Sequence, residues 1–196
     1  MAVLWRSAIS RSESSEAEIA AGRPWEWVPA PWQRQLGWGD LVAKAPRQVL
    51  ADGVTLFHDG SGAAVLRQVE QGGRAHGVAL SSQGENGSFL SIVFDLPDAS
   101  ARHLRPWQIV RLQCRISAEP AAPRLYARFN LSHGPNIETL VREVDGQGAA
   151  EFDLAYCPME VSRIEKAWID LIFEGGCPPR AVLSDLCIAR RPRGGF

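Results

Sequence analysis

The densest polar cluster of the chain lies around residues 130–136. Asn130 stands near the end of an apolar run, and the run stops at Ser132-His-Gly-Pro-Asn136. Loops at strand ends are where rigid scaffolds place ligand-binding groups, and His133 and Asn136 could bind neighbouring hydroxyl groups of a ligand together with Asn130. The alternative is structural, because Gly134-Pro135 is a turn sequence whose backbone Asn136 can satisfy.

A second candidate surface is the polar face of residues 124–132. Apolar and polar residues alternate along this segment, so one face carries Tyr126, Arg128 and Asn130. Sugar-binding modules stack rings on exposed tryptophan or tyrosine, and Tyr126 is the best exposed aromatic candidate, together with a tryptophan from residues 23–38. The predicted ligand-binding residues are therefore Tyr126, Arg128, Asn130, His133 and Asn136. Trp107 and Trp168, in strand-like segments, are predicted to lie in the core.

Catalytic chemistry has little support in the sequence. His58 and Asp59 could form part of a metal or acid–base site with His133, but such distant combinations arise by chance. Asp170 and Glu174 are about 13 Å apart along one strand, which is too far for a glycosidase pair within that strand, so solvated-face charges describe them better. No GxSxG, HExxH, P-loop or GxGxxG motif occurs. We expect no catalytic residue, no metal ligand and no cofactor, with a structural calcium ion left open.

The segments that position these residues read as strands and turns. From residue 54 onward, eight or nine short apolar runs are separated by turn signals, and amphipathic helices of ten or more residues are missing. This pattern predicts an all-β, antiparallel β-sandwich or jelly roll with one or two short helices. Residues 54–58 with 64–70, and 77–81 with 88–96, are predicted to form two hairpins through glycine-rich turns.

The N-terminal part divides into two segments. Residues 1–22 are small, polar and acidic, and are predicted to be a polar segment, at most a short helix. Residues 23–196 are predicted to be the sandwich domain with an N-terminal strap, residues 23–53. Residues 23–38 hold four tryptophans and three prolines, which favours an extended strap fastened onto the outside of a sheet. The alternative is an exposed aromatic platform.

Composition and charge bound the possible partners. The 196 residues hold 21 basic and 22 acidic side chains, a net charge of -1, so the sequence predicts no nucleic-acid partner. No stretch approaches the ~20 apolar residues of a membrane span. Four cysteines without metal-site spacing are expected to be reduced thiols. With no signal-peptide pattern, we expect a cytoplasmic protein, and export by another route stays open.

Several strings carry a resemblance to a known family. KAPRQVLADGVTLFHD (44–59), GSFLSIVFDLPD (87–98), ARFNLSHGPNIETLVREV (127–144), EFDLAY (151–156) and residues 165–193 resemble an uncharacterised alphaproteobacterial domain family of unknown function. The closing pair Trp168-Ile-Asp-Leu and Leu183-Ser-Asp-Leu is similar to the galactose-binding-like jelly roll of many carbohydrate-binding modules. That resemblance implies a fold and raises the expectation of glycan binding.

These observations favour a non-catalytic binding module for carbohydrate or a cell-surface glycan. The first alternative is a structural or assembly domain that binds another protein through the strap and a sheet face. The third is a glycan-active hydrolase, which would require two carboxylates that converge in a cleft.

Overall fold

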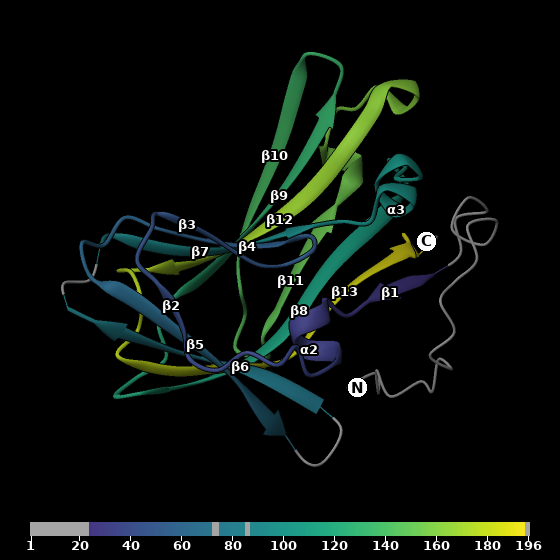
Figure 1. Cartoon of the computed structure of the whole chain (residues 1–196). Helices are drawn as coiled ribbons and strands as arrows, with labels where there is room; N and C mark the ends of the chain where they lie inside the picture. The colour runs from purple at the N-terminus through teal and green to yellow at the C-terminus, as the bar shows by residue number, and fades with distance from the viewer. Residues whose placement is uncertain (1–23, 72–74, 85–86, 195–196) are drawn as a thin grey trace.

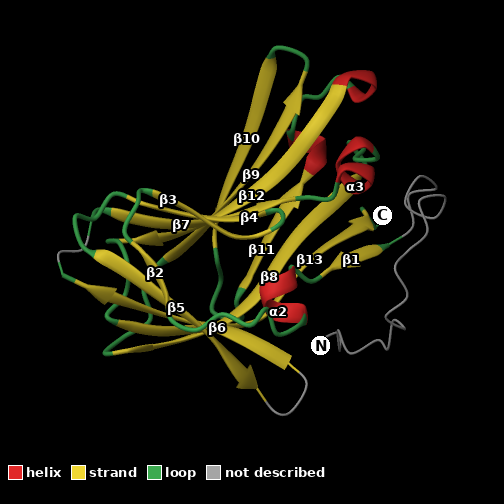
Figure 2. Ribbon diagram, in the orientation of Figure 1, coloured by secondary structure: helices red, strands yellow, loops and turns green. Residues whose placement is uncertain are grey.

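The computed structural model describes residues 24–71, 75–84 and 87–194. The predicted polar segment at residues 1–22 lies outside this part of the chain. Within it, thirteen strands form two antiparallel sheets packed face to face (Figure 2). The connections between the strands hold two short α-helices and two 3-10 helices. The predicted all-β sandwich is confirmed.

One sheet has six strands in the order β10-β9-β12-β7-β4-β3. Its strands are β3 (Arg47–Ala51), β4 (Val54–His58), β7 (Phe89–Asp95), β9 (Leu125–His133), β10 (Asn136–Glu143) and β12 (Ile164–Glu174). In Figure 1 these strands form the upper layer.

The other sheet has seven strands in the order β11-β8-β13-β6-β5-β2, and β1 pairs with the free part of β13. Its strands are β1 (Trp25–Trp27), β2 (Leu41–Ala43), β5 (Ala63–Gln71), β6 (Ala75–Gln83), β8 (Gln108–Glu119), β11 (Ala149–Asp153) and β13 (Arg180–Pro192). The connections hold α2 (Ala30–Gln33), α3 (Asp98–Arg102), η1 (Leu154–Tyr156) and η2 (Val161–Arg163). No helix of the described residues is long and apolar enough to cross a membrane.

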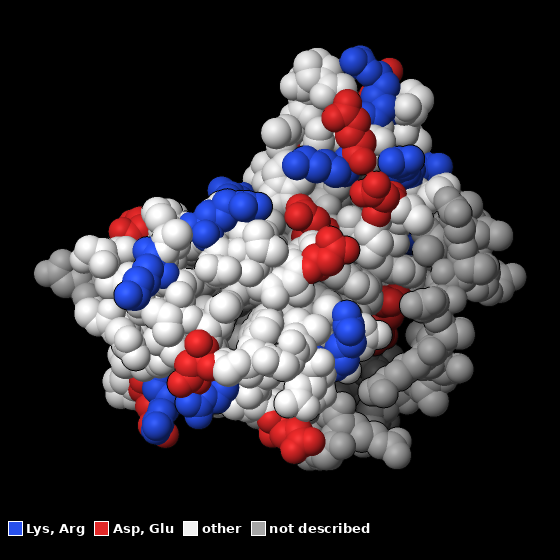
Figure 3. Space-filling model, in the orientation of Figure 1, with Lys and Arg blue, Asp and Glu red and all other residues white. Residues whose placement is uncertain are grey.

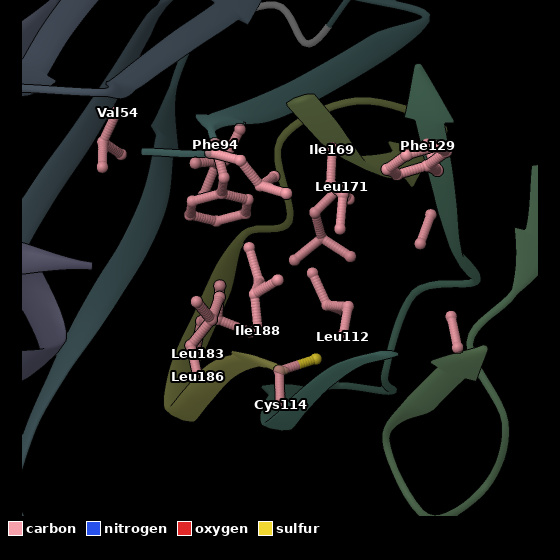
Figure 4. Packing of buried hydrophobic residues seen from close by; sticks show 14 of the residues in the cluster. Val54, Phe94, Leu112, Cys114, Phe129, Ile169, Leu171, Leu183, Leu186 and Ile188 are labelled. Atoms are coloured by element: carbon pink, nitrogen blue, oxygen red, sulfur yellow. The ribbon is translucent and has the colours of Figure 1, made fainter. Parts of the chain in front are cut away.

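The core lies between the sheets and is built by alternation along each strand. In β9 and β12, every second residue is buried against the opposite sheet, as Figure 4 shows for Phe129, Ile169 and Leu171. In β8 the inward set, which includes Leu112 and Cys114, alternates with polar residues as the sequence predicts. Among the described residues, four phenylalanines are fully buried: Phe94, Phe129, Phe152 and Phe173.

The tryptophan-rich strap contributes to the core itself. Trp25 and Trp32 are buried, and Trp27 and Trp38 pack against the core with part of their surface exposed. Trp32 joins the two sheets, because its Nε1 donates to the Leu183 carbonyl of β13 at 2.9 Å while its ring meets Phe94 of β7 edge-on at 5.6 Å. The strap is thus fastened deeper than an outer-face attachment, and part of it is the helical turn α2 rather than extended chain.

The two predicted hairpins are wrong. β4 and β5 belong to different sheets, and so do β6 and β7, so both glycine-rich connections cross the sandwich. The connections are joined instead to each other: the Asp59 carboxylate accepts from Ser88 Oγ at 2.6 Å and from the Phe89 amide at 3.1 Å. A Cβ at Gly87 would overlap that carboxylate. Turn-forming residues show where the chain turns and leave open which sheet it enters next.

We predict that Trp32 is a principal stabilising residue of the strap. Trp32→Ala should lower the free energy of unfolding by about 3–5 kcal/mol, since it removes a large buried ring and leaves the Leu183 carbonyl without its donor. Trp107 is the matched control, because it is 49% exposed rather than in the predicted core, and Trp107→Ala should change stability by about 0.5 kcal/mol or less. Equal losses in urea denaturation of the two variants would contradict this account.

A second prediction concerns the link between the crossovers. The hydrogen bond from Ser88, followed by that from the Phe89 amide, lowers the pKa of Asp59. A carboxyl group with a lowered pKa stabilises the fold above its unfolded-state pKa, and this contribution is lost as the pH falls through the folded-state pKa. Ser88→Ala should therefore raise the Asp59 pKa toward its ordinary value in an NMR titration of the carboxyl carbon. An unchanged Asp59 titration would show that the Ser88 bond does not form in solution.

Candidate functional site

The outer face of the six-stranded sheet holds a groove with a volume of about 650 Å³, here called the sheet groove. Figure 1 shows this sheet strongly curved, and the space-filling outline in Figure 3 is hollowed between the lobe at the top and the part at the left. The groove crosses five strands of the sheet, from β3 to β9. Its lining residues are Arg47, Thr55, Phe57, Phe89, Ser91, Val93, Asp95, Arg128, Lys166, Trp168, Asp170 and Ile172.

Strand register brings these side chains together. In β12 the inward positions fill the core, so Trp168, Asp170 and Ile172 point out of the opposite face. Asp170 lies directly opposite Arg128 of β9 on one side and opposite Val93 of β7 on the other. Residues opposite one another in paired strands have Cβ atoms about 5 Å apart, so the groove floor is a continuous array.

A buried carboxylate lies in the floor of the sheet groove. Asp170 Oδ2 accepts from Arg128 Nε at 2.6 Å and from Asn130 Nδ2 at 2.9 Å. Asn130 is held in turn, because its Oδ1 accepts from Thr139 Oγ1 at 3.1 Å. The Asp170 side chain is 4% exposed, so its description as a solvated-face charge is wrong.

The Arg128 side chain reaches from this buried pair to the groove surface. It is 46% exposed, and only its Nε atom is engaged by Asp170. No described residue accepts a hydrogen bond from its two terminal nitrogens, Nη1 and Nη2. Asp170 therefore orients the guanidinium group through Nε, and the Nη1 and Nη2 atoms can donate hydrogen bonds to a ligand.

Aromatic side chains supply the apolar part of the groove. Trp168 is half-buried on the outer face, so its predicted place in the core is wrong. The Lys166 Nζ atom lies 4.7 Å from the centre of the Trp168 ring, within cation–π range. Phe57 and exposed Phe89 lie further along the groove on β4 and β7.

Family comparison places the chain in a family without an assigned activity. The model of the family of unknown function DUF6478 matches residues 5–196. The chain belongs to this family. No curated protein matches it.

Two solved structures illustrate which folds this chain is similar to. A cyclase from Fischerella sp. TAU is 9% identical over 88% of this chain and 100% of its own, with a TM-score of 0.51. A family 11 carbohydrate-binding module of a cellulosomal cellulase of Clostridium thermocellum is 15% identical over 76% of this chain and 94% of its own, with a TM-score of 0.44. At these identities a likeness concerns the fold alone.

In this DUF6478 chain, three of the five predicted ligand-binding residues share one face. Arg128 lines the sheet groove, Asn130 lies beneath it as a partner of Asp170, and Tyr126 lies beyond it, opposite Ile172 of β12. The predicted polar face of residues 124–132 is thus present. Asn130 uses its amide within the protein, which makes it a support for the groove floor.

The other two predicted residues lie at the turn between β9 and β10, where His133 ends β9 and Asn136 begins β10. About 23 Å of strand separates His133 from Tyr126. His133 is buried, and its Nδ1 accepts from the Glu160 amide at 3.2 Å, whereas Asn136 is exposed. At Gly134 the φ angle is 58°, and an added Cβ would meet the Arg163 guanidinium. These contacts favour the structural interpretation of this turn and separate it from the groove.

The groove residues on β3, β4 and β7 and those on β12 escaped prediction for different reasons. Alternation in residues 167–174 places Trp168, Asp170 and Ile172 on the face opposite Ile169 and Leu171. The sequence therefore contains the signal that these three residues point away from the core. The residues on β3, β4 and β7 could not be assigned, because the predicted hairpins placed β4 and β7 beside the wrong strands.

Other reactive groups do not form a centre in the described part of the chain. It contains no group of three or more His, Cys, Asp or Glu side chains arranged to hold a metal ion. His58 and His133 lie near opposite ends of β12, about 30 Å apart by strand rise. Burial raises the pKa of the Cys157 and Cys177 thiols to about 11, which disfavours the reactive thiolate.

We predict that the Arg128–Asp170 pair matters more for stability than an exposed pair with the same bond. Arg128→Ala should lower the free energy of unfolding by about 1–2 kcal/mol, because it removes a charged donor from buried Asp170 while Arg128 itself is half-exposed. Arg67→Ala is the control, since Arg67 Nε also donates to a carboxylate, Asp40, at 2.6 Å but on an exposed surface. A larger loss for Arg67→Ala in chemical denaturation would reverse this ranking.

Proposed function

We propose that this chain is a non-catalytic module that binds carbohydrate in the sheet groove. The observation that carries the proposal is the combination of an outward tryptophan, Trp168, with the oriented guanidinium of Arg128 in one hollow surface. The groove volume, about 650 Å³, lies in the range of small-molecule sites.

The chemistry of the groove suits a sugar. A pyranose ring has C–H faces that pack on aromatic rings, and its hydroxyl groups both donate and accept hydrogen bonds. Trp168, Phe57 and Phe89 offer the aromatic surface. Arg128 offers donors, and Asp95 offers acceptors at the end of β7.

The groove carboxylates favour binding over hydrolysis. Glycosidases of the usual kind use two carboxyl groups on one bond, one of which donates a proton. The two carboxylates of the lining are Asp95 and Asp170. Asp170 Oδ2 already accepts hydrogen bonds from Arg128 and Asn130, and the Asp170 side chain is buried, so this carboxyl group is engaged within the protein rather than facing a ligand in the groove.

A protein partner is the second candidate, and one observation favours it. Of the large hydrophobic residues exposed in the described chain, four lie on this outer face: Val49, Phe89, Ile137 and Val141. Three of them are aliphatic and belong to the edge strands β3 and β10. Exposed aliphatic surface of this kind suits contact with a protein.

Light scattering on a size-exclusion column tests this alternative, because an obligate assembly would elute as an oligomer.

The test of the carbohydrate proposal is Trp168→Ala. Affinity gel electrophoresis against a panel of soluble neutral and acidic polysaccharides should identify a binder, and isothermal titration should then show at least a tenfold loss of affinity in Trp168→Ala, because the stacking surface is gone. Trp107→Ala removes an exposed tryptophan outside the groove and should bind like the unchanged protein. No retardation by any polysaccharide, or equal affinity in the two variants, would overturn the proposal.

A further inference from the structure

We infer that the sheet groove selects an acidic saccharide, one whose sugar carries a carboxylate that binds the terminal nitrogens of Arg128. This inference rests on the proposed function and names the class of glycan. It is carried by three features of the groove: the orientation of Arg128, the position of Lys166 and the balance of charge.

The first feature is the free edge of Arg128. The chain of hydrogen bonds from Thr139 through Asn130 and Asp170 fixes the guanidinium on its Nε side. Its Nη1 and Nη2 atoms form a planar fork, and this fork matches a carboxylate with two parallel hydrogen bonds. Because the side chain is already ordered, little conformational entropy is lost when an anion binds.

The second feature is Lys166, which covers the ring that a sugar would use. Its Nζ lies 4.7 Å from the centre of the Trp168 ring, and it forms no ion pair with a described residue. A neutral sugar that stacks on this face must displace the ammonium group without replacing its attraction to the ring. An acidic sugar offers the ammonium a carboxylate instead, so the displacement is compensated.

The third feature is the charge of the lining. Three cations, Arg47, Arg128 and Lys166, face two carboxylates, Asp95 and Asp170. Asp170 is paired with Arg128, and the five side chains together carry a formal charge of +1 in a chain whose net charge is -1. A positive groove in such a chain attracts anionic ligands.

Asp95 sets the direction in which the saccharide lies. It pairs opposite Trp168 on the β7 side, whereas Arg128 lies on the β9 side of β12. A sugar carboxylate is repelled by Asp95 and attracted by Arg128. The acidic group therefore faces β9, and hydroxyl groups face Asp95.

The experiment compares each acidic glycan with its neutral twin. The probes are polygalacturonate, alginate and a glucuronan, each beside its carboxyl-reduced form, with affinities measured by titration calorimetry at two salt concentrations. At least one acidic form should bind tenfold or more tightly than its reduced twin, and its affinity should fall as salt rises.

Two variants locate the acidic group. Arg128→Lys keeps a cation for Asp170 but loses the fork, and should weaken the acidic glycan about 10- to 100-fold while the reduced form changes little. Lys166→Gln alters an exposed side chain with no predicted effect on folding and should also weaken the acidic form selectively. Arg180→Gln, an exposed cation on β13 outside the groove, is the control and should leave both affinities unchanged.

The outcomes separate this inference from the proposed function. Equal or tighter binding of the reduced glycans overturns the acidic class and leaves carbohydrate binding in place. Selective binding that neither Arg128→Lys nor Lys166→Gln weakens overturns the assigned position of the carboxylate. Binding of no glycan, acidic or neutral, overturns both proposals together.

Discussion

The burial of one face of each central strand is the constraint on which the sheet groove depends. In β12, Ala167, Ile169, Leu171 and Phe173 fill the core, and this leaves Trp168, Asp170 and Ile172 no other direction than outward. A slip of one residue would exchange the two faces, expose the apolar set and bury the polar one. The apolar core therefore fixes the strand register that brings the groove residues together, although no groove residue belongs to that core.

The buried Asp170 carboxylate shows how this face is stabilised. A carboxylate removed from water is costly unless hydrogen bonds replace its hydration. Here Arg128 and Asn130 of the neighbouring strand β9 donate the replacing hydrogen bonds, and Thr139 of β10 holds Asn130 in place through a further bond. The same bonds order the guanidinium that faces the groove. One polar network thus serves both the stability of the sheet and the orientation of its surface, so substitutions in it require separate measurements of folding and of binding.

The local sequence pattern predicted which face of a strand each residue occupies, because this depends on neighbouring residues. It did not predict which strands pair, because pairing depends on residues far apart in the sequence. Alternation in residues 108–116 and 124–132 was sufficient to assign their faces, and with them Arg128 and Asn130. The connections from β4 to β5 and from β6 to β7 have the sequence of hairpin turns, because glycine-rich turns look alike whether the chain returns to its own sheet or crosses to the other. Trp168 was missed because an aromatic residue in an apolar run resembles core, and Trp32 was placed too far out because a proline-rich segment resembles an external strap. Only the pairing of distant strands distinguishes these cases.

A likeness to a cyclase at 9% identity concerns the fold and not the activity. The function of this DUF6478 chain must therefore be inferred from its own side chains. Those side chains are not distributed evenly over the outer face. The middle strands β9 and β12 carry buried Asp170 with its donors Arg128 and Asn130, the aromatic ring of Trp168 and the cation Lys166, and β7 adds Asp95. The edge strands β3 and β10 carry exposed Val49, Ile137 and Val141. A polar and aromatic centre suits a small hydrophilic ligand, because each buried polar group can find a partner there. Aliphatic edges gain nothing from such a ligand, so they mark the part of this face where contact with a protein would be made.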